Sequence, residues 1–113
     1  MKKPKPNLGQ FEELTLLAII KLRDQAYGMK IRQTLEHVTK RSVSIGALYT
    51  TLDRLEKKRL ITSWQGEATA ERGGRAKRYF SVESAGIKAL NDSQRVRNEM
   101  LQGVDLTWEP AGR

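Results

Sequence analysis

The sequence predicts a mainly α-helical fold with one small β-hairpin, in the order helix, helix, helix, hairpin, helix. Between residues 10 and 58, apolar side chains recur at the three- and four-residue spacing of helices. Between residues 60 and 82, β-branched and aromatic residues flank a glycine-rich loop, which is typical of a hairpin. The length of 113 residues leaves room for one hydrophobic core. We therefore expect a single small domain.

The first helix is expected at about residues 10–23, and a second helix follows an interruption at residues 26–28 and continues to about Lys40. Apolar residues surround the first helix on nearly all sides, which predicts burial on more than one side. In so short a chain, a second subunit is a natural source of that extra burial. The buried face of the second helix is expected to contain Tyr27, Ile31, Leu35 and Val38.

A third helix is expected from Ser44, a favourable N-cap residue, to about Lys58. Its predicted core face contains Ile45, Leu48, Leu52 and Leu55. The opposite side carries small, hydroxyl and basic side chains, which allow close approach to a DNA groove and contacts with bases and phosphates. The residues assigned to this surface are Ser44, Gly46, Ala47, Tyr49, Thr50, Arg54 and Lys57.

The hairpin is expected to consist of strands at residues 60–65 and 77–82. Arg72, Arg75, Lys77 and Arg78 fall within seven residues around two glycines, with no acid among them. A thin basic loop can follow a DNA backbone or enter a minor groove. We assign Arg72, Arg75 and Lys77 to such a wing. Two closely spaced helices followed by a hairpin are the element order of a winged helix-turn-helix.

The last helix is expected at about residues 83–101. The chain would then comprise a flexible basic arm at 1–8, a winged helix-turn-helix domain at 9–82, and a dimerisation helix with its tail at 83–113. A heptad seam connects Ile87, Leu90, Leu101 and Val104, although Gln94 and Arg97 interrupt it. Trp108 follows the helix, where it would either cap a dimer interface or contact a planar small-molecule effector.

The net charge and the residue types present limit the classes of partner and activity that we expect. Lys and Arg number 21 against 13 Asp and Glu, a formal charge of +8, which suits nucleic acid, an anionic membrane or an acidic protein. The absence of cysteine, and a single histidine, His37, without partner ligands, predict no metal site, no cofactor and no enzyme activity. The longest apolar stretch, residues 14–22, is too short to span a membrane, so we expect no membrane partner and a cytoplasmic location.

Several segments together resemble the PadR family of bacterial transcriptional regulators. They are residues 46–58, 60–61, 73–80 and 85–86, with residues 14–18 and 27–28 similar to the first two helices of that family. The resemblance spans roughly residues 8–101 and implies a winged-helix fold, a homodimer joined through the first and last helices, and repression. It matches Tyr49 to the family's recognition-helix tyrosine, and Arg75 and Lys77 to its basic wing.

The chain departs from this family at two places. Arg59 stands where the family often has glycine, which leaves the end of the third helix open, because a left-handed helix end accommodates glycine better. Glu83 and Ser84 replace its usual Thr-Pro, so the start of the last helix is less sharply defined.

The function expected from these observations is sequence-specific regulation of transcription. The protein would bind a two-fold-related operator in double-stranded DNA as a homodimer and act as a repressor. Release by a small aromatic effector is an additional hypothesis. From the residues alone, two alternatives remain: a winged-helix protein-interaction module without sequence-specific DNA binding, and a non-specific DNA-binding protein.

Overall fold

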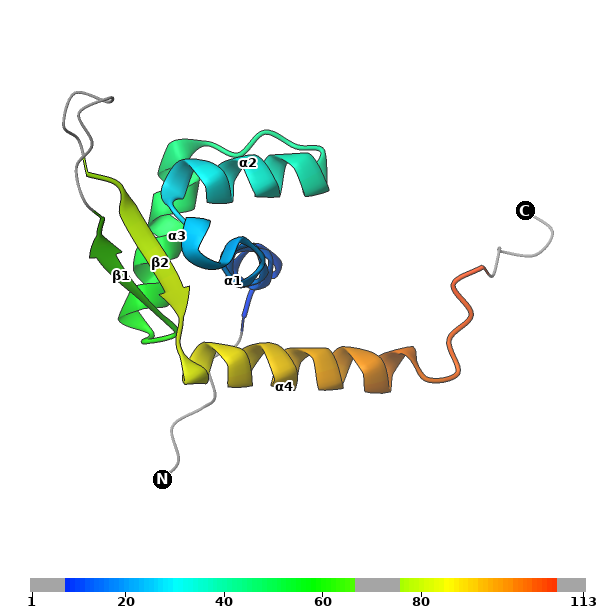
Figure 1. Ribbon diagram of the computed structural model, residues 1–113. Coiled ribbons are helices and arrows are strands. Elements are labelled where there is room, and N and C mark those ends of the chain that lie inside the picture. Colours follow the sequence, from blue (N-terminus) through cyan, green and yellow to red (C-terminus); the bar gives the residue numbers. More distant parts are fainter. Residues whose placement is uncertain (1–7, 67–75, 108–113) are drawn as a thin grey trace.

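The structure is a computed structural model that describes residues 8–66 and 76–107. Its elements follow the predicted order (Figure 1). A short 3₁₀ turn, η1 (Arg23–Gln25), connects the first two helices. The mainly helical fold with one antiparallel hairpin confirms the predicted fold class. The longer elements are α1 (Gln10–Leu22), α2 (Gly28–Thr39), α3 (Ile45–Lys57), β1 (Ile61–Gln65), β2 (Arg78–Val82) and α4 (Ser84–Leu101).

The hydrophobic core lies where α1, α2 and α3 pack together and the hairpin closes one side (Figure 1). Strands β1 and β2 pair in antiparallel register, with Ser63 opposite Phe80. Phe80 is the largest of the fully buried side chains, and burial of a side chain of this size stabilises the fold by about 1.5–3 kcal/mol. The core thereby fixes α3 relative to the hairpin. Its other members include Leu16, Ile19, Ile31, Leu35, Leu48, Leu52, Leu55, Leu60 and Ile61.

Two residues predicted to face the core are exposed instead. Ile45 retains 52% of its accessible surface and Val38 retains 59%. Both are in phase with the apolar face of their helix, but Ile45 lies in the first turn of α3 and Val38 in the last turn of α2. The packing of the helices does not cover these two side chains, so the prediction of both as core residues was wrong. Leu48 is the first buried residue of α3.

A Schellman motif ends α3 and places Arg59 in the left-handed region, with φ of 62°. The Arg59 N–H donates to the Glu56 carbonyl at 2.9 Å, and the Leu60 N–H donates to the Leu55 carbonyl at 3.0 Å. Leu55 and Leu60 are both buried. The motif therefore turns the chain from α3 directly into β1, although arginine occupies the position that favours glycine.

Replacing Arg59 with glycine should raise the free energy of unfolding by about 1 kcal/mol. A side chain in the left-handed region costs roughly 1–2 kcal/mol, which the greater freedom of glycine in the unfolded chain partly offsets. Urea denaturation followed by circular dichroism measures the change. The control Lys57→Gly, in the right-handed last turn of α3, should lower stability by about 1 kcal/mol. Two shifts of the same sign would contradict the assignment.

Helix α4 packs against the domain along its first half. The Glu83 N–H donates to the Leu60 carbonyl at 2.8 Å, and a Cβ added at the buried Gly86 would lie 2.5 Å from the same oxygen. Only glycine permits this approach. Farther along, the Ser93 hydroxyl donates to the Glu13 carboxylate. The last turns of α4 extend beyond the other helices (Figure 1).

The heptad seam expected along the last helix is not continuous. Val104 lies beyond the end of α4 at Leu101, and therefore cannot share a helical face with the residues before it. Leu90 is partly buried against the core of its own subunit, whereas Ile87 is 41% exposed. Residues with heptad spacing in the sequence therefore do not form one continuous seam in the structure.

Candidate nucleic-acid interface

One side of α3 is exposed along the whole helix. Leu48, Leu52 and Leu55 form the buried side, and helical geometry places Gly46, Thr50 and Lys57 opposite them. Ala47 and Arg54 lie on the flank toward α1, since Arg54 is close enough to lower the pKa of Glu12. We call these five exposed residues the α3 outer face: Gly46, Ala47, Thr50, Arg54 and Lys57. The structure brings these five predicted contact residues together on one accessible surface.

Gly46 is the most informative residue of this face. A helical glycine costs up to about 1 kcal/mol relative to alanine, so its presence requires a reason. A Cβ added at Gly46 would meet nothing within 4 Å in the described chain besides the adjoining backbone of its own helix, and the φ of Gly46 is not positive. Neither packing nor backbone conformation in the described structure therefore requires glycine here. Close approach by another molecule is a requirement that would explain it.

Ser44 begins α3 as its N-cap residue. Its hydroxyl oxygen accepts a hydrogen bond from the Ala47 N–H at 3.0 Å, which satisfies one of the free amides of the first turn. Such a cap contributes about 1 kcal/mol. The predicted cap is confirmed, and it leaves the exposed Ser44 at the edge of the α3 outer face.

Tyr49 lies on the flank of α3 that faces α2 and is partly buried. A Cβ added at Gly28 would lie 2.1 Å from the Tyr49 hydroxyl oxygen. The absence of a side chain at Gly28, the first residue of α2, therefore makes room for the tyrosine. Packing against α2 fixes the direction of the Tyr49 ring.

Lys77 lies at the base of the hairpin, whereas Arg72 and Arg75, the other predicted wing residues, lie outside the described residues. The Lys77 ammonium sits 4.0 Å from the centroid of the Tyr27 ring, a cation–π contact. Tyr27 meets Tyr79 edge to face, with centroids 5.5 Å apart. Trp64, half exposed, stacks on Tyr79. This cluster holds Lys77 beside the start of α2.

Two other basic residues close to these surfaces, Arg78 and Lys58, are engaged within the fold. Arg78 lies 2.7 Å from the Glu56 carboxylate and 3.7 Å from that of Asp53. Lys58 lies 3.0 Å from the buried Glu12. The basic segment of the hairpin contains no acidic residue, but two acidic residues of α3, Asp53 and Glu56, lie close enough to pair with Arg78. The spacing of Asp53 and Glu56, three residues apart on one side of a helix, is the signal that could have indicated this pairing.

The carboxyl group of Glu12 is buried and held in its ionised form. Burial raises its pKa, but the Gly9 N–H at 2.9 Å and the Lys58 ammonium favour the carboxylate more strongly. The pKa therefore lies below the ordinary value of 4.5. Glu12 thus fastens the start of α1 to the end of α3.

This shift predicts acid sensitivity. Because the folded state binds the Glu12 proton less tightly than the unfolded state, its contribution is present above pH 4.5 and disappears as pH falls through the lowered pKa. Glu12→Gln should reduce the free energy of unfolding at neutral pH by about 1 kcal/mol. Urea denaturation across pH should show the difference from wild type shrinking below pH 4.5. A difference independent of pH would contradict the ion pair.

Within residues 8–66 and 76–107, no group of three or more His, Asp or Glu residues is placed to hold a metal ion. No helix in those ranges is long and apolar enough to cross a membrane. His37 is exposed on α2.

Comparison with known proteins identifies the family. Residues 16–92, more than half of the chain, match the model of the transcriptional regulator PadR-like family. The chain belongs to the PadR-like family. Membership confirms the resemblance seen in the sequence and the winged helix-turn-helix fold. A PadR-like protein is a regulator of transcription, which implies that it acts through DNA.

Two solved structures and one curated relative are similar to this chain. A PadR-like transcription factor from Bacteroides fragilis superposes with a TM-score of 0.73 at 26% identity, covering 85% of this chain and 87% of that one. A transcriptional regulator from Clostridium thermocellum shares the fold, with a TM-score of 0.66 at 23% identity over 82% of this chain and 87% of its own. An uncharacterized protein of Lysinibacillus sphaericus is 30% identical over 103 residues, which are 89% of this chain and 90% of that protein.

Proposed function

We propose that this PadR-like protein is a sequence-specific repressor that binds a two-fold-related DNA site as a homodimer. Helix α3 would lie in the major groove, with Gly46 and Thr50 near base edges and Arg54 and Lys57 near phosphates. The observation that carries this proposal is Gly46, a glycine on an exposed helical face where the described fold has no need of one. Ser44, Ala47 and Tyr49 would complete the contact surface around it.

The hairpin would supply the second set of contacts. Lys77, held over Tyr27, lies at its base, and Arg72 and Arg75 would extend the basic surface along the flanking backbone or minor groove. The pairing of Arg78 with Asp53 supports this arrangement, because Asp53 is exposed on α3 and its carboxylate would otherwise repel phosphates. The formal charge of +8 favours association with DNA in general.

Selection of bound duplexes from a random library, followed by gel-shift titration, tests the proposal. Arg54→Ala should weaken binding to every duplex and lower the slope of log affinity against log salt by about one unit, because one phosphate contact is lost. Thr50→Val should instead change the preferred sequence. Arg95→Ala, an exposed arginine on α4, is the control, and it should leave the slope unchanged provided that sedimentation shows the variant to be a dimer like the wild type. No gel shift on any duplex would favour the protein-interaction module.

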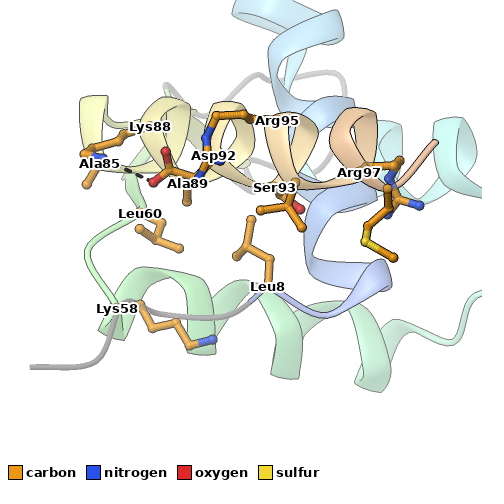
Figure 2. Close-up of a pocket in the computed structure, with 12 residues that line it drawn as sticks. Leu8, Lys58, Leu60, Ala85, Lys88, Ala89, Asp92, Ser93, Arg95 and Arg97 are labelled. Carbon is orange, nitrogen blue, oxygen red and sulfur yellow. Dashed lines mark hydrogen bonds and ion pairs between the residues drawn. The ribbon is translucent and has the colours of Figure 1, made fainter. Parts of the chain in front are cut away.

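We further propose that the dimer forms through α1 and α4. Large apolar side chains remain exposed on both helices: Leu17 (44%) and Ile20 (39%) on α1, and Val96 (52%) and Met100 (73%) on α4. Beside α4 lies a groove of about 720 Å³. Figure 2 shows Leu8 and Leu60 lining this groove opposite α4. A second subunit would remove these apolar surfaces from water.

The same region is our proposed place for an effector. The groove is lined mainly by apolar atoms, including those of Ala89, Val96 and Met100, which suits a small aromatic compound held between subunits. Trp108, which lies outside the described residues, would stack on such a compound. Quenching of tryptophan fluorescence by planar aromatic compounds, lost in Trp108→Ala, would support this assignment.

A further inference from the structure

The connection between α2 and α3 is held through a single residue, Val43. The Arg32 Nε–H donates to the Val43 carbonyl at 2.6 Å, and the Val43 N–H donates to the Glu36 carboxylate at 2.8 Å. Arg32 and Glu36 are one turn apart on α2, and their charged groups lie 3.9 Å from each other. Two side chains of α2 thus satisfy both backbone polar groups of Val43. We call this arrangement the Val43 clamp.

The clamp acts directly before the α3 outer face. Val43 precedes Ser44, the N-cap of α3, and its side chain is buried, with 7% of its surface exposed. The residues before it, Arg41 and Ser42, are exposed. Val43 is therefore the fixed point of the connection, held by the clamp through its backbone and by the core through its side chain. Its position sets where the first turn of α3, with Gly46, begins.

The hydrogen bonds of the Val43 clamp fix the orientation of the Val43 peptide in addition to stabilising the fold. Hydrogen bonds to charged groups are shorter and roughly twice as strong as neutral ones, and they impose direction. Arg32 and Glu36 also neutralise each other, so neither leaves an unpaired charge beside the core. Their side chains are about one-third exposed, at 30% and 34%. An apolar pair at these positions would contribute packing but would not orient the Val43 peptide.

We propose that Arg32 and Glu36 are positioning residues, which hold the Val43 peptide and thereby set the angle at which α3 meets DNA. This inference rests on the proposed function, since it takes α3 as the recognition helix. Base contacts require a helix in register, whereas phosphate contacts tolerate small displacements. Loss of the clamp therefore reduces discrimination between the operator and other duplexes more than it reduces general affinity.

The first test compares binding of the full-length protein to its selected operator and to an unrelated duplex of equal length. Glu36→Ala should lower the ratio of the two affinities about tenfold, the size of one mismatched base pair. Glu36→Gln, which keeps an oxygen to accept from Val43, should restore most of the ratio. Glu99→Ala removes a similarly spaced arginine partner on α4 and, where sedimentation shows the same dimer as wild type, should leave the ratio unchanged.

The second test needs no DNA. Amide hydrogen exchange measured by NMR should be about tenfold faster at Val43 in Glu36→Ala than in wild type, and close to wild type in Glu36→Gln. If the wild type selects no operator, the proposed function fails, and exchange alone still decides whether the clamp exists. If wild type selects an operator and Glu36→Ala keeps the same affinity ratio, the positioning role is overturned, whatever the exchange rate. Should Glu36→Ala not fold, Arg32→Lys carries the affinity comparison, because lysine keeps the charge and lacks the Nε donor to the Val43 carbonyl.

Discussion

Replacing Val96 and Met100 together with glutamate is expected to produce a monomer whose operator affinity is at least about 100-fold lower. Both side chains are more than half exposed on α4, so the folded subunit tolerates the change, whereas a dimer would bury two carboxylates per subunit without partners. Each half-site would then be bound separately, and the gain from two linked contacts, typically about 10²–10⁴-fold, would disappear. Analytical ultracentrifugation and gel-shift titration measure the two effects.

The control for this experiment is Val38→Glu. Val38 is equally exposed but lies on α2, away from the proposed subunit contact. It should leave the sedimentation of the protein unchanged. If the double variant remains a dimer, α4 is not the interface. If it becomes a monomer and retains full operator affinity, the two-fold mode of DNA binding is wrong.

Sequence reasoning located the helices and the outer surface of α3 because the information is local. Leucines at positions 48, 52 and 55 define an inward direction, and the opposite direction follows from helical geometry. The cap at Ser44 is local in the same way, since the hydroxyl and the amide that it accepts from are three residues apart. The composition of the hairpin likewise indicated its two strands.

The spacing of apolar residues shows which face of a helix points toward the core, but it does not show how much of that face neighbouring elements cover. This is why Ile45 and Val38 were assigned to the core although they lie at exposed helix ends. The predicted heptad seam was wrong for a related reason. Val104 has heptad spacing from the earlier residues in the sequence, but it lies beyond the end of α4.

Contacts between distant segments were beyond sequence reasoning. The pairing of Arg78 with Glu56 depends on β2 lying beside α3, and the fit of Tyr49 over Gly28 depends on the packing of α3 against α2. Arg32 and Glu36 have the spacing of an ordinary surface ion pair, and only the path of the following connection gives them Val43 as a partner. The residues assigned to DNA contact remain predictions, which the binding experiments decide.

Two glycines in helices offer the sharpest contrast between a fold requirement and a functional one. Gly86→Ala should lower the free energy of unfolding by about 2–3 kcal/mol, because the new methyl group would lie 2.5 Å from the Leu60 carbonyl and 2.6 Å from Val82 Cγ1. The carbonyl cannot move freely, since it accepts the hydrogen bond from Glu83 that leads into α4. Urea denaturation measures the loss.

Gly46→Ala should do the opposite to stability and still impair function. With nothing within 4 Å of the new methyl group, the helix gains up to about 1 kcal/mol. If α3 lies in a DNA groove, the same methyl group meets the DNA surface, and operator affinity should fall about tenfold, as for one unfavourable base contact. A variant that is both more stable and fully able to bind its operator would show that Gly46 does not face DNA. In that case the α3 outer face would lose the observation that separates it from the solvated side of an ordinary helix.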